Sequence, residues 1–401
     1  MTEMKSLLRF PGERKLALTN CPIPLPGKNT LLVQTCYSLI SPGTEFTQAG
    51  ETRASLLQKA WQRPDLVALT LSHLKSEGLQ STLRRVDNRL GRPMHMGYCA
   101  VGRVEATGDN VSGFVPKQRV VMAGMGQANH AEWNRVSVNL ACPIPDAVAD
   151  RNAAFAPLYA LALHALRQGE TSIGDNIAII GAGLIGQLVA QTAGTAGAFV
   201  TVIEPNPTRR ALATSNEQIR CYATANDAPG NHFDAVYICA PGKADHHLID
   251  DAARLCRDRG MIVCVGNVEP TGKRKALYEK EITIRQVRSY GPGRYDPNYE
   301  ERGEDYPLGY VRWTIKRNMQ AALDLMADKR LDPSPLITSE IDFENIVDHF
   351  AMGPDPAQLA TIVRYRPFEN TKAAPLAPSG QQSEPVNGHV RIGLIGAGNY
   401  S

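Results

Sequence analysis

The sequence has few of the features that mark secreted, membrane-spanning or nucleic-acid-binding proteins. Its eight cysteines, spread over 401 residues, include no CxxC pair. No apolar run reaches the roughly 18 residues needed to span a bilayer, and the N-terminal stretch lacks the apolar core and cleavage site of a signal peptide. The formal net charge of +3 is too small to indicate nucleic acid as a partner. We therefore expect a reduced, cytoplasmic protein that binds neither membranes nor nucleic acid.

The composition is that of a globular protein with more than one domain. Hydrophobic residues make up 43% of the chain and charged residues 21%, and 401 residues suggest two or three domains. Residues 1–152 read as a strand-rich domain, interrupted at 53–90 by an insertion with apolar residues at helical spacing. From 153 to 290, apolar strand patterns alternate with amphipathic helix patterns. This alternation predicts a doubly wound parallel sheet, and hence an α/β fold.

The C-terminal part of the chain changes composition twice. Residues 367–389 are rich in Pro, Ser, Gly and Gln and have little to bury, which is typical of a linker. Residues 390–401, VRIGLIGAGNYS, read as a strand that runs into a glycine turn. We expect no second dinucleotide site there, because the phosphate site of such a turn depends on the helix that follows it.

A dinucleotide-binding motif occupies residues 177–194, IAIIGAGLIGQLVAQTAG. Its glycines have the G-x-G-x-x-G spacing, it joins an expected strand to an expected helix, and an acidic residue ends the next strand. Such glycines allow a tight turn, close approach to a pyrophosphate and close packing of helix on strand. The candidate cofactor-binding residues are Gly181, Gly183, Leu184, Ile185, Gly186, Glu204 and Arg209.

The cofactor that this motif predicts is NAD rather than NADP. Glu204 can accept hydrogen bonds from the ribose hydroxyls, and its charge would repel a 2′-phosphate. Arg209 and Arg210 leave the opposite preference open, because either guanidinium can pair with a phosphate.

Several segments together resemble the medium-chain dehydrogenase/reductase superfamily along residues 1–366. These segments are SLISPGTE, KAWQRPDLV, MGYCAVG, AIIGAGLIGQL, YEKEITIR and SYGPGRYDPNYEERGEDYPLGYVRWT. More narrowly, the chain resembles bi-domain oxidoreductases, in which such a module precedes one of the Gfo/Idh/MocA type. The resemblance implies a GroES-like catalytic domain, to which residues 291–366 return, around a Rossmann domain at 153–290. It also identifies 390–401 as the truncated start of a second Rossmann module.

The zinc ligands of the superfamily's alcohol dehydrogenases have no full counterpart here. The matching positions hold Ser41, Tyr98, Cys99 and the Pro157 region, so one thiol remains. His95 precedes Cys99 by four residues, but two donors do not make a zinc site. We therefore expect no bound metal, and hydride chemistry without zinc.

Without a metal, side chains must polarise the carbonyl and move the proton. Thr44 and Glu45 lie at an expected Pro-Gly turn, where the superfamily often places a proton-relay hydroxyl. Glu45 is either a general base with a raised pKa or a brace for the turn. Tyr98 is either a proton donor or a packing residue. These three are the candidate catalytic residues.

The candidate substrate residues come from two segments. Lys59 and Arg63 share one face of the inserted helix, where they either bind a polar substrate or are solvated. In SYGPGRYDP, Arg294 offers forked donors and Tyr295 an aromatic surface for a sugar face. The alternative is that Arg294 pairs within the chain with Asp296 or a glutamate.

Three functions are consistent with these residues. The first is an NAD-dependent oxidoreductase that interconverts alcohol and ketone on a sugar or related polar metabolite. The second is a zinc-free enoyl or quinone reductase, and the third is a nucleotide-binding scaffold for a separate partner module of the Gfo/Idh/MocA type. The sugar assignment comes only from the resemblance. We also expect a homodimer.

Overall fold

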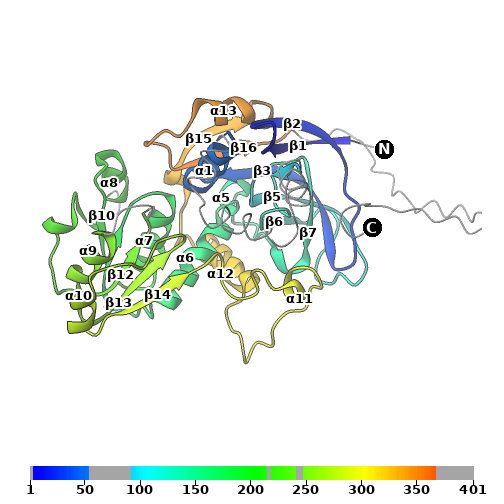
Figure 1. Ribbon diagram of the computed structural model, residues 1–401. Coiled ribbons are helices and arrows are strands. Elements are labelled where there is room, and N and C mark those ends of the chain that lie inside the picture. Colours follow the sequence, from blue (N-terminus) through cyan, green and yellow to red (C-terminus); the bar gives the residue numbers. More distant parts are fainter. Residues whose placement is uncertain (1–2, 54–91, 215–217, 241–246, 367–401) are drawn as a thin grey trace, which may run out of the picture. The chain divides into compact units, whose positions relative to one another are not determined.

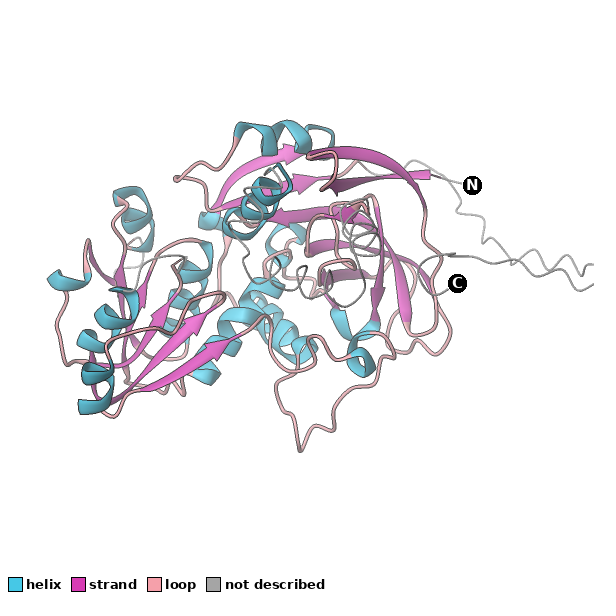
Figure 2. Cartoon of the chain, viewed as in Figure 1, coloured by secondary structure: helices cyan, strands magenta, loops and turns pink. Residues whose placement is uncertain are grey.

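The computed structural model describes residues 3–53, 92–214, 218–240 and 247–366. Apart from residue 53, the expected insertion at 53–90 lies outside the described residues, and so do the linker at 367–389 and the segment 390–401. The described residues have a mixed α/β fold with a parallel sheet, as the sequence predicts (Figures 1 and 2). No helix among them is long and apolar enough to cross a bilayer.

The strand-rich part contains two sheets, and both are built mainly from antiparallel pairs. A three-stranded sheet has the order β2-β1-β4, and a seven-stranded sheet has the order β15-β16-β3-β5-β6-β8, with β7 also pairing with β3. The strands are β1 (Glu3–Phe10), β2 (Lys15–Pro22), β3 (Thr30–Ile40), β4 (Met94–His95), β5 (Cys99–Thr107), β6 (Arg119–Ala123), β7 (Trp133–Ser137), β8 (Ala141–Pro143), β15 (Ile337–Asp342) and β16 (Ala360–Arg364).

The pairing of β16 with β3 brings the end of the described chain back to its beginning. The register aligns Thr361 with Ile40 and Arg364 with Tyr37, and in Figure 1 the orange β16 runs beside the blue β3. Residues on both sides of the parallel sheet in sequence therefore share one antiparallel sheet.

The second part is a six-stranded parallel sheet with the order β11-β10-β9-β12-β13-β14. Its strands are β9 (Asn176–Ile180), β10 (Phe199–Ile203), β11 (Arg220–Tyr222), β12 (Phe233–Ile238), β13 (Cys256–Val265) and β14 (Thr283–Val287). Its order reverses at β9, between β10 and β12. In open sheets of this kind, ligands bind outside the carboxyl ends of the strands at such a point.

Helices and short 3-10 turns (η) connect the strands. The helices are α1 (Pro42–Arg53), α5 (Asp150–Ala153), α6 (Ala156–Gln168), α7 (Leu184–Thr195), α8 (Pro207–Ala213), α9 (His247–Leu255), α10 (Arg274–Glu279), α11 (Pro297–Glu300), α12 (Ile315–Ala327) and α13 (Ile346–Met352). The turns are η1 (Val138–Leu140), η2 (Ala225–Asp227), η3 (Ser334–Leu336) and η4 (Phe343–Asn345).

Both faces of the parallel sheet are covered, which explains the apolar runs of its central strands β9 and β10. Alternate residues of β9 belong to different cores: Ile177 and Ile179 pack with Leu188 of α7, whereas Ala178 and Ile180 pack with Ile249 of α9. Successive side chains of a strand point to opposite faces, so each strand contributes to both layers.

The expected Pro-Gly turn before Thr44 and Glu45 was wrong. Pro42 begins helix α1 instead, and Glu45 lies in its first turn. The physical reason is that proline suits the first helical position, where its missing N–H has no helical partner to lose. A carboxylate is also favourable in the first turn of a helix, and Oε1 of Glu45 accepts the N–H of Ser41 at 3.0 Å.

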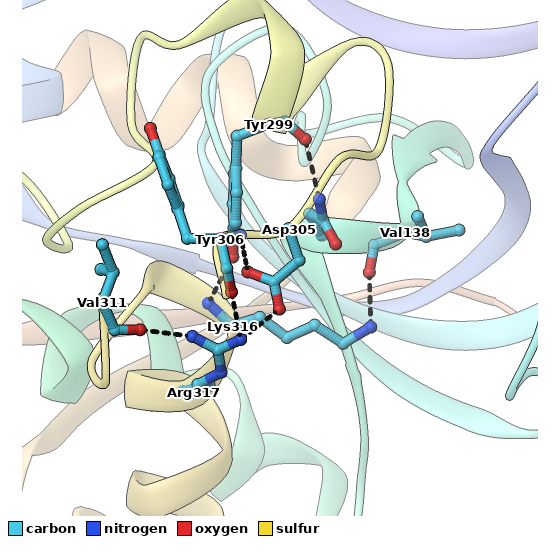
Figure 3. Close-up of polar contacts among 8 residues, drawn as sticks. Val138, Tyr299, Asp305, Tyr306, Val311, Lys316 and Arg317 are labelled. Carbon is cyan, nitrogen blue, oxygen red and sulfur yellow. Dashed lines mark hydrogen bonds and ion pairs between the residues drawn. The ribbon is translucent and has the colours of Figure 1, made fainter. Parts of the chain in front are cut away.

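Several polar contacts connect residues 299–311, which precede α12, to the first turn of that helix (Figure 3). The backbone N–H of Lys316 donates to the hydroxyl of Tyr299 at 3.2 Å, and its ammonium donates to the carbonyl of Val138 at 2.9 Å. Arg317 donates to Asp305 at 2.6 Å. These contacts hold the loop that leads from the parallel sheet back to the strand-rich part.

Candidate functional site

Three hydroxyl groups meet where β3 ends, α1 begins and β5 begins. The side chains of Ser41 and Thr44 lie within reach of the hydroxyl of Tyr98 and oppose the rise of its pKa. Tyr98 and Ser41 are buried, whereas Thr44 is exposed. Burial, and then the negative charge of Glu45, raise the pKa of Tyr98, so the phenol keeps its proton. The cluster therefore offers a protonated donor that reaches the surface through Thr44.

A chain of hydrogen bonds lies behind this cluster. Oε2 of Glu45 accepts from Nε2 of His130 at 2.7 Å, Nδ1 of His130 lies 2.7 Å from Oγ of Ser38, and that oxygen lies 2.9 Å from the hydroxyl of Tyr365. The side chains of Glu45 and His130 are fully buried. Because a carboxylate only accepts, Nε2 of His130 carries a proton and donates it in the hydrogen bond to Glu45.

This geometry favours the bracing role for Glu45 over the general base. One carboxylate oxygen accepts from Ser41 N–H and the other from His130, and the side chain has no exposed surface. A base must reach the proton that it removes. Glu45 instead acts on Tyr98 through its charge.

Tyr290 is a site residue that the sequence analysis missed, although it belongs to the segment SYGPGRYDP. It is buried, and burial raises its pKa well above the usual value. Its backbone carbonyl accepts from Nδ2 of Asn318 at 3.0 Å. Tyr290 therefore adds a second buried, protonated phenol to the candidate substrate loop.

The structure pairs Arg294 with a glutamate, which was one of the two alternatives. Its guanidinium forms an ion pair with Glu300, and both side chains are almost buried. Burial lowers the pKa of Arg294, but the hydrogen bond and the charge of Glu300, together with Tyr290 and Tyr295, raise it above its usual value. Tyr295 is half exposed beside it. Lys59 and Arg63 lie outside the described residues.

The glycine turn between β9 and α7 has the geometry that a dinucleotide phosphate needs. Gly181 has φ +97°, a conformation that side chains rarely adopt. A Cβ on Gly186 would lie 1.9 Å from the carbonyl oxygen of Gly181, so only glycine fits. A Cβ on Gly183 would meet nothing within 4 Å, which leaves space in front of the helix N-terminus. Leu184 and Ile185 form the first turn of α7.

Glu204 at the end of β10 is buried and holds the same turn. Its Oε2 accepts from the N–H of Ala182 at 2.7 Å, and its Oε1 from the N–H of Asn206 at 2.9 Å. Each oxygen has a second lone pair for a ribose hydroxyl. Arg209 donates to the carbonyl of Pro356, and Arg210 to the carbonyl of Glu204 itself.

The donor set near Tyr98 does not fit a catalytic zinc. A thiol must lose its proton to bind zinc, but burial and the charge of Glu45 raise the pKa of Cys99 well above its usual value. His95 hydrogen-bonds to Ser6 at 3.0 Å. In the described part of the chain, no three His, Cys, Asp or Glu side chains are grouped so that they could hold a metal.

His130, Ser38 and Tyr365 were also missed, and their spacing offered no signal. His130 lies 85 residues from Glu45, and Tyr365 lies 327 residues from Ser38. Local motifs do not predict such contacts, because these depend on how β16 and the segment before β7 pack on β3.

Part of the chain is similar in sequence to a curated protein. No protein-family model matches the chain. The 2-dehydro-3-deoxy-L-galactonate 5-dehydrogenase of Pseudoalteromonas atlantica is 28% identical in an alignment of 155 residues, and the match covers 32% of this chain and 45% of that enzyme. The chain therefore matches less than half of the length of this curated relative.

Solved structures match over nearly the whole fold. An alcohol dehydrogenase of Escherichia coli CFT073, solved with NADH, superposes with a TM-score of 0.66 at 15% identity, over 91% of this chain and 100% of that one. A thermostable alcohol dehydrogenase of Pyrobaculum aerophilum, which holds cobalt and zinc, gives 0.64 at 16% identity, over 90% and 100%. The chain has the fold of these dehydrogenases. This confirms the expected fold class of a GroES-like β-rich domain and a Rossmann sheet.

Proposed function

We propose that the chain is an NAD-dependent, zinc-independent oxidoreductase that interconverts alcohol and ketone on a sugar or related polar metabolite. The observation that carries this proposal is the buried phenol of Tyr98, which lies beside the side chains of Ser41 and Thr44 and whose proton is retained through burial and the charge of Glu45. It offers the hydrogen-bond donor that a carbonyl oxygen needs when no metal polarises it.

The glycine turn supports a nicotinamide dinucleotide as the cofactor. Gly183 leaves space at the N-terminus of α7, where backbone N–H groups favour a pyrophosphate, and Glu204 lies where ribose hydroxyls are bound in such folds. When bound, the cofactor supplies or accepts the hydride. The carboxylate of Glu204 favours NAD, because it would repel the 2′-phosphate of NADP.

The chain's own residues supply the proton. In the direction of reduction, Tyr98 donates a hydrogen bond to the carbonyl oxygen and then its proton. Thr44, which is exposed, returns a proton to Tyr98 from solvent. Glu45 opposes ionisation of Tyr98 throughout, so the phenol is reset as a donor. In the direction of oxidation, the same hydroxyls carry the proton outwards.

The test combines a substrate screen with one conservative variant. Purified protein is titrated with NADH and NADPH and then assayed with sugars, alcohols, enones and quinones. For the best carbonyl substrate, Tyr98→Phe should lower kcat by roughly 10²- to 10⁴-fold and leave the Kd for NADH unchanged. Tyr159→Phe is the matched control, because it removes another buried phenol hydroxyl, which bonds to Gln191.

Several outcomes would contradict the proposal. Wild-type turnover by Tyr98→Phe would remove the phenol from the mechanism. Turnover of enones or quinones alone would favour the reductase alternative, and NADH binding without any turnover would favour the scaffold. About one zinc per chain, with activity lost to a chelator, would refute zinc independence.

A further inference from the structure

Arg288 lies just beyond β14, on the side of the parallel sheet where ligands bind. It is the first residue after Val287, which ends the strand, and its side chain is exposed. The Cζ atom of Arg288 lies 3.8 Å from the centre of the Tyr295 ring. The carboxyl ends of such strands face the ligand in doubly wound sheets. Arg288 therefore presents an oriented guanidinium at the functional edge.

The backbone around Tyr295 is held in an uncommon conformation. Tyr295 has φ +69° and Ser289 has φ +60°, and Gly291 and Gly293 between them also have positive φ. An aromatic residue in this region of φ costs on the order of 1–3 kcal/mol, and such positions concentrate at ligand sites. Glu300 fixes the turn by accepting the N–H of Tyr295 at 3.1 Å. The half-exposed ring of Tyr295 is therefore fixed in one orientation, and we call the flat surface that it offers the shelf.

Two guanidinium groups border this ring, but only one of them is neutralised. Arg294 lies 4.3 Å from the ring centre and is ion-paired with Glu300. Arg288, in contrast, has no carboxylate partner among the residues that the structure describes. The positive charge that is available to a ligand at this shelf therefore belongs to Arg288 and not to Arg294.

The loop that carries the shelf lies close to the segment that holds Tyr98. Gly124 donates its N–H to the carbonyl of Tyr98 at 3.0 Å, and a Cβ on Gly124 would lie 4.0 Å from Nη1 of Arg294. A substrate whose carbonyl meets Tyr98 can therefore be bound at its other end by residues of this loop.

We propose that Arg288 binds a carboxylate of the substrate, and that the substrate is a polyhydroxylated monocarboxylic acid of the sugar-acid class. This inference rests on the proposed oxidoreductase function. A guanidinium binds a carboxylate with two parallel hydrogen bonds, and the Tyr295 ring fixes the plane of that fork. One guanidinium without a carboxylate partner among the described residues matches the single charge of a carboxylate. The curated relative that matches part of the chain is named for a sugar acid, 2-dehydro-3-deoxy-L-galactonate.

The experiment compares an acid with its neutral counterpart on the full chain loaded with NADH. L-galactonate and galactitol are titrated by calorimetry, and galactose 6-phosphate serves as a second anion. We expect wild-type protein to bind the acid at least 10-fold more tightly than the alditol. Arg288→Gln should weaken binding of the acid roughly 10- to 100-fold and leave binding of the alditol and of NADH unchanged. Arg288→Lys should give an intermediate loss, because it keeps the charge without the fork.

The matched control is Arg274→Gln, which removes another exposed guanidinium that lies over a tyrosine, here Tyr278 at 5.7 Å. It should change nothing. Equal binding of acid and alditol, no binding of the acid, tighter binding of the phosphate, or identical behaviour of the two Arg→Gln variants would each overturn the proposal. All of these leave NADH-dependent turnover of another substrate intact, whereas failure to bind NADH would contradict the proposed function itself.

Discussion

Among the described residues, each part of the fold contains one buried carboxylate, and the two are held differently. Glu204 accepts two backbone N–H groups, from Ala182 and Asn206. Glu45 accepts one backbone N–H, from Ser41, and one side-chain N–H, from His130. The first carboxylate fixes a loop for a ligand. The second ends a chain of side chains and places a charge behind Tyr98.

This difference decides how readily each carboxylate could be recognised. Ala182 is 22 residues from Glu204, and its N–H is present whatever its side chain, so the motif spacing is enough to predict the site. His130 is 85 residues from Glu45, and no other part of the local sequence supplies that donor. A site built on backbone groups is therefore visible in a motif, whereas a site built on distant side chains is not.

The largest expected effect comes from removing Glu45. Glu45→Ala leaves the N–H groups of His130 and Ser41 buried without an acceptor, and breaking such a buried pair costs about 3–5 kcal/mol. Glu204→Ala leaves two backbone N–H groups without an acceptor, and we expect it to lower the free energy of unfolding by about 1–3 kcal/mol. Urea unfolding at neutral pH, followed by circular dichroism, measures both free energies.

Glu132→Ala is the control for these two variants, because its part-exposed carboxylate holds only the N–H of Lys5. Glu132→Ala should lower the free energy of unfolding by less than either of the other two variants. If Glu45→Ala lowered the free energy of unfolding no more than Glu204→Ala, the hydrogen bonds that link Glu45 to His130 would stabilise the fold no more than a loop contact does. The proposed difference between the two carboxylates would then be wrong.

The second expected effect concerns cofactor choice. Glu204→Ala removes the charge that repels a 2′-phosphate, so the preference for NAD over NADP should fall about tenfold, which corresponds to 1.4 kcal/mol. Fluorescence titration with NADH and NADPH gives both Kd values. Glu204→Gln removes the charge but keeps an acceptor for one loop amide, and should narrow the preference with less loss of NADH affinity. An equal loss of affinity for NADH and NADPH would mean that Glu204 only stabilises the glycine turn.

The smallest expected effect is a pH dependence of stability near Glu45. Burial lowers the pKa of His349 below its usual 6.5, Glu45 partly opposes this shift, and His130 adds to it. Between the folded pKa and pH 6.5 the unfolded chain binds more protons, so stability is complete above pH 6.5 and falls as the pH drops below it. His349→Asn should reduce the pH dependence of the free energy of unfolding between pH 5.5 and 7, by less than about 1.4 kcal/mol per pH unit. Urea unfolding at several pH values measures this slope. His232→Asn, on an exposed histidine, should leave the slope unchanged.

The parallel sheet was the most predictable region of the molecule. Its central strands β9, β10 and β12 are mainly apolar because both faces are covered, and helices follow them at regular intervals, so local pattern and tertiary structure agree. The glycine turn was predictable for the same reason, since the constraint on Gly181 and Gly186 comes from neighbouring backbone.

The strand-rich part and its site were less predictable. Pro42 was interpreted as a turn residue but begins a helix, because proline is compatible with both. Arg294 was considered for substrate, yet Glu300 neutralises it within the same loop. Tyr290 gave no signal of its own, since its burial depends on how residues far apart in sequence pack together.

The pairing of β16 with β3 sets an order of events during protein synthesis. Tyr37 and Arg364 are register partners, separated by 364 − 37 = 327 residues. At about 5–20 residues per second, β3 waits roughly 16–65 s for this neighbour. The parallel sheet, which is continuous in sequence from β9 to β14, is complete before that neighbour has been translated. On the ribosome, the cofactor-binding part can therefore fold first, while one edge of β3 stays open to other partners until the last strand arrives.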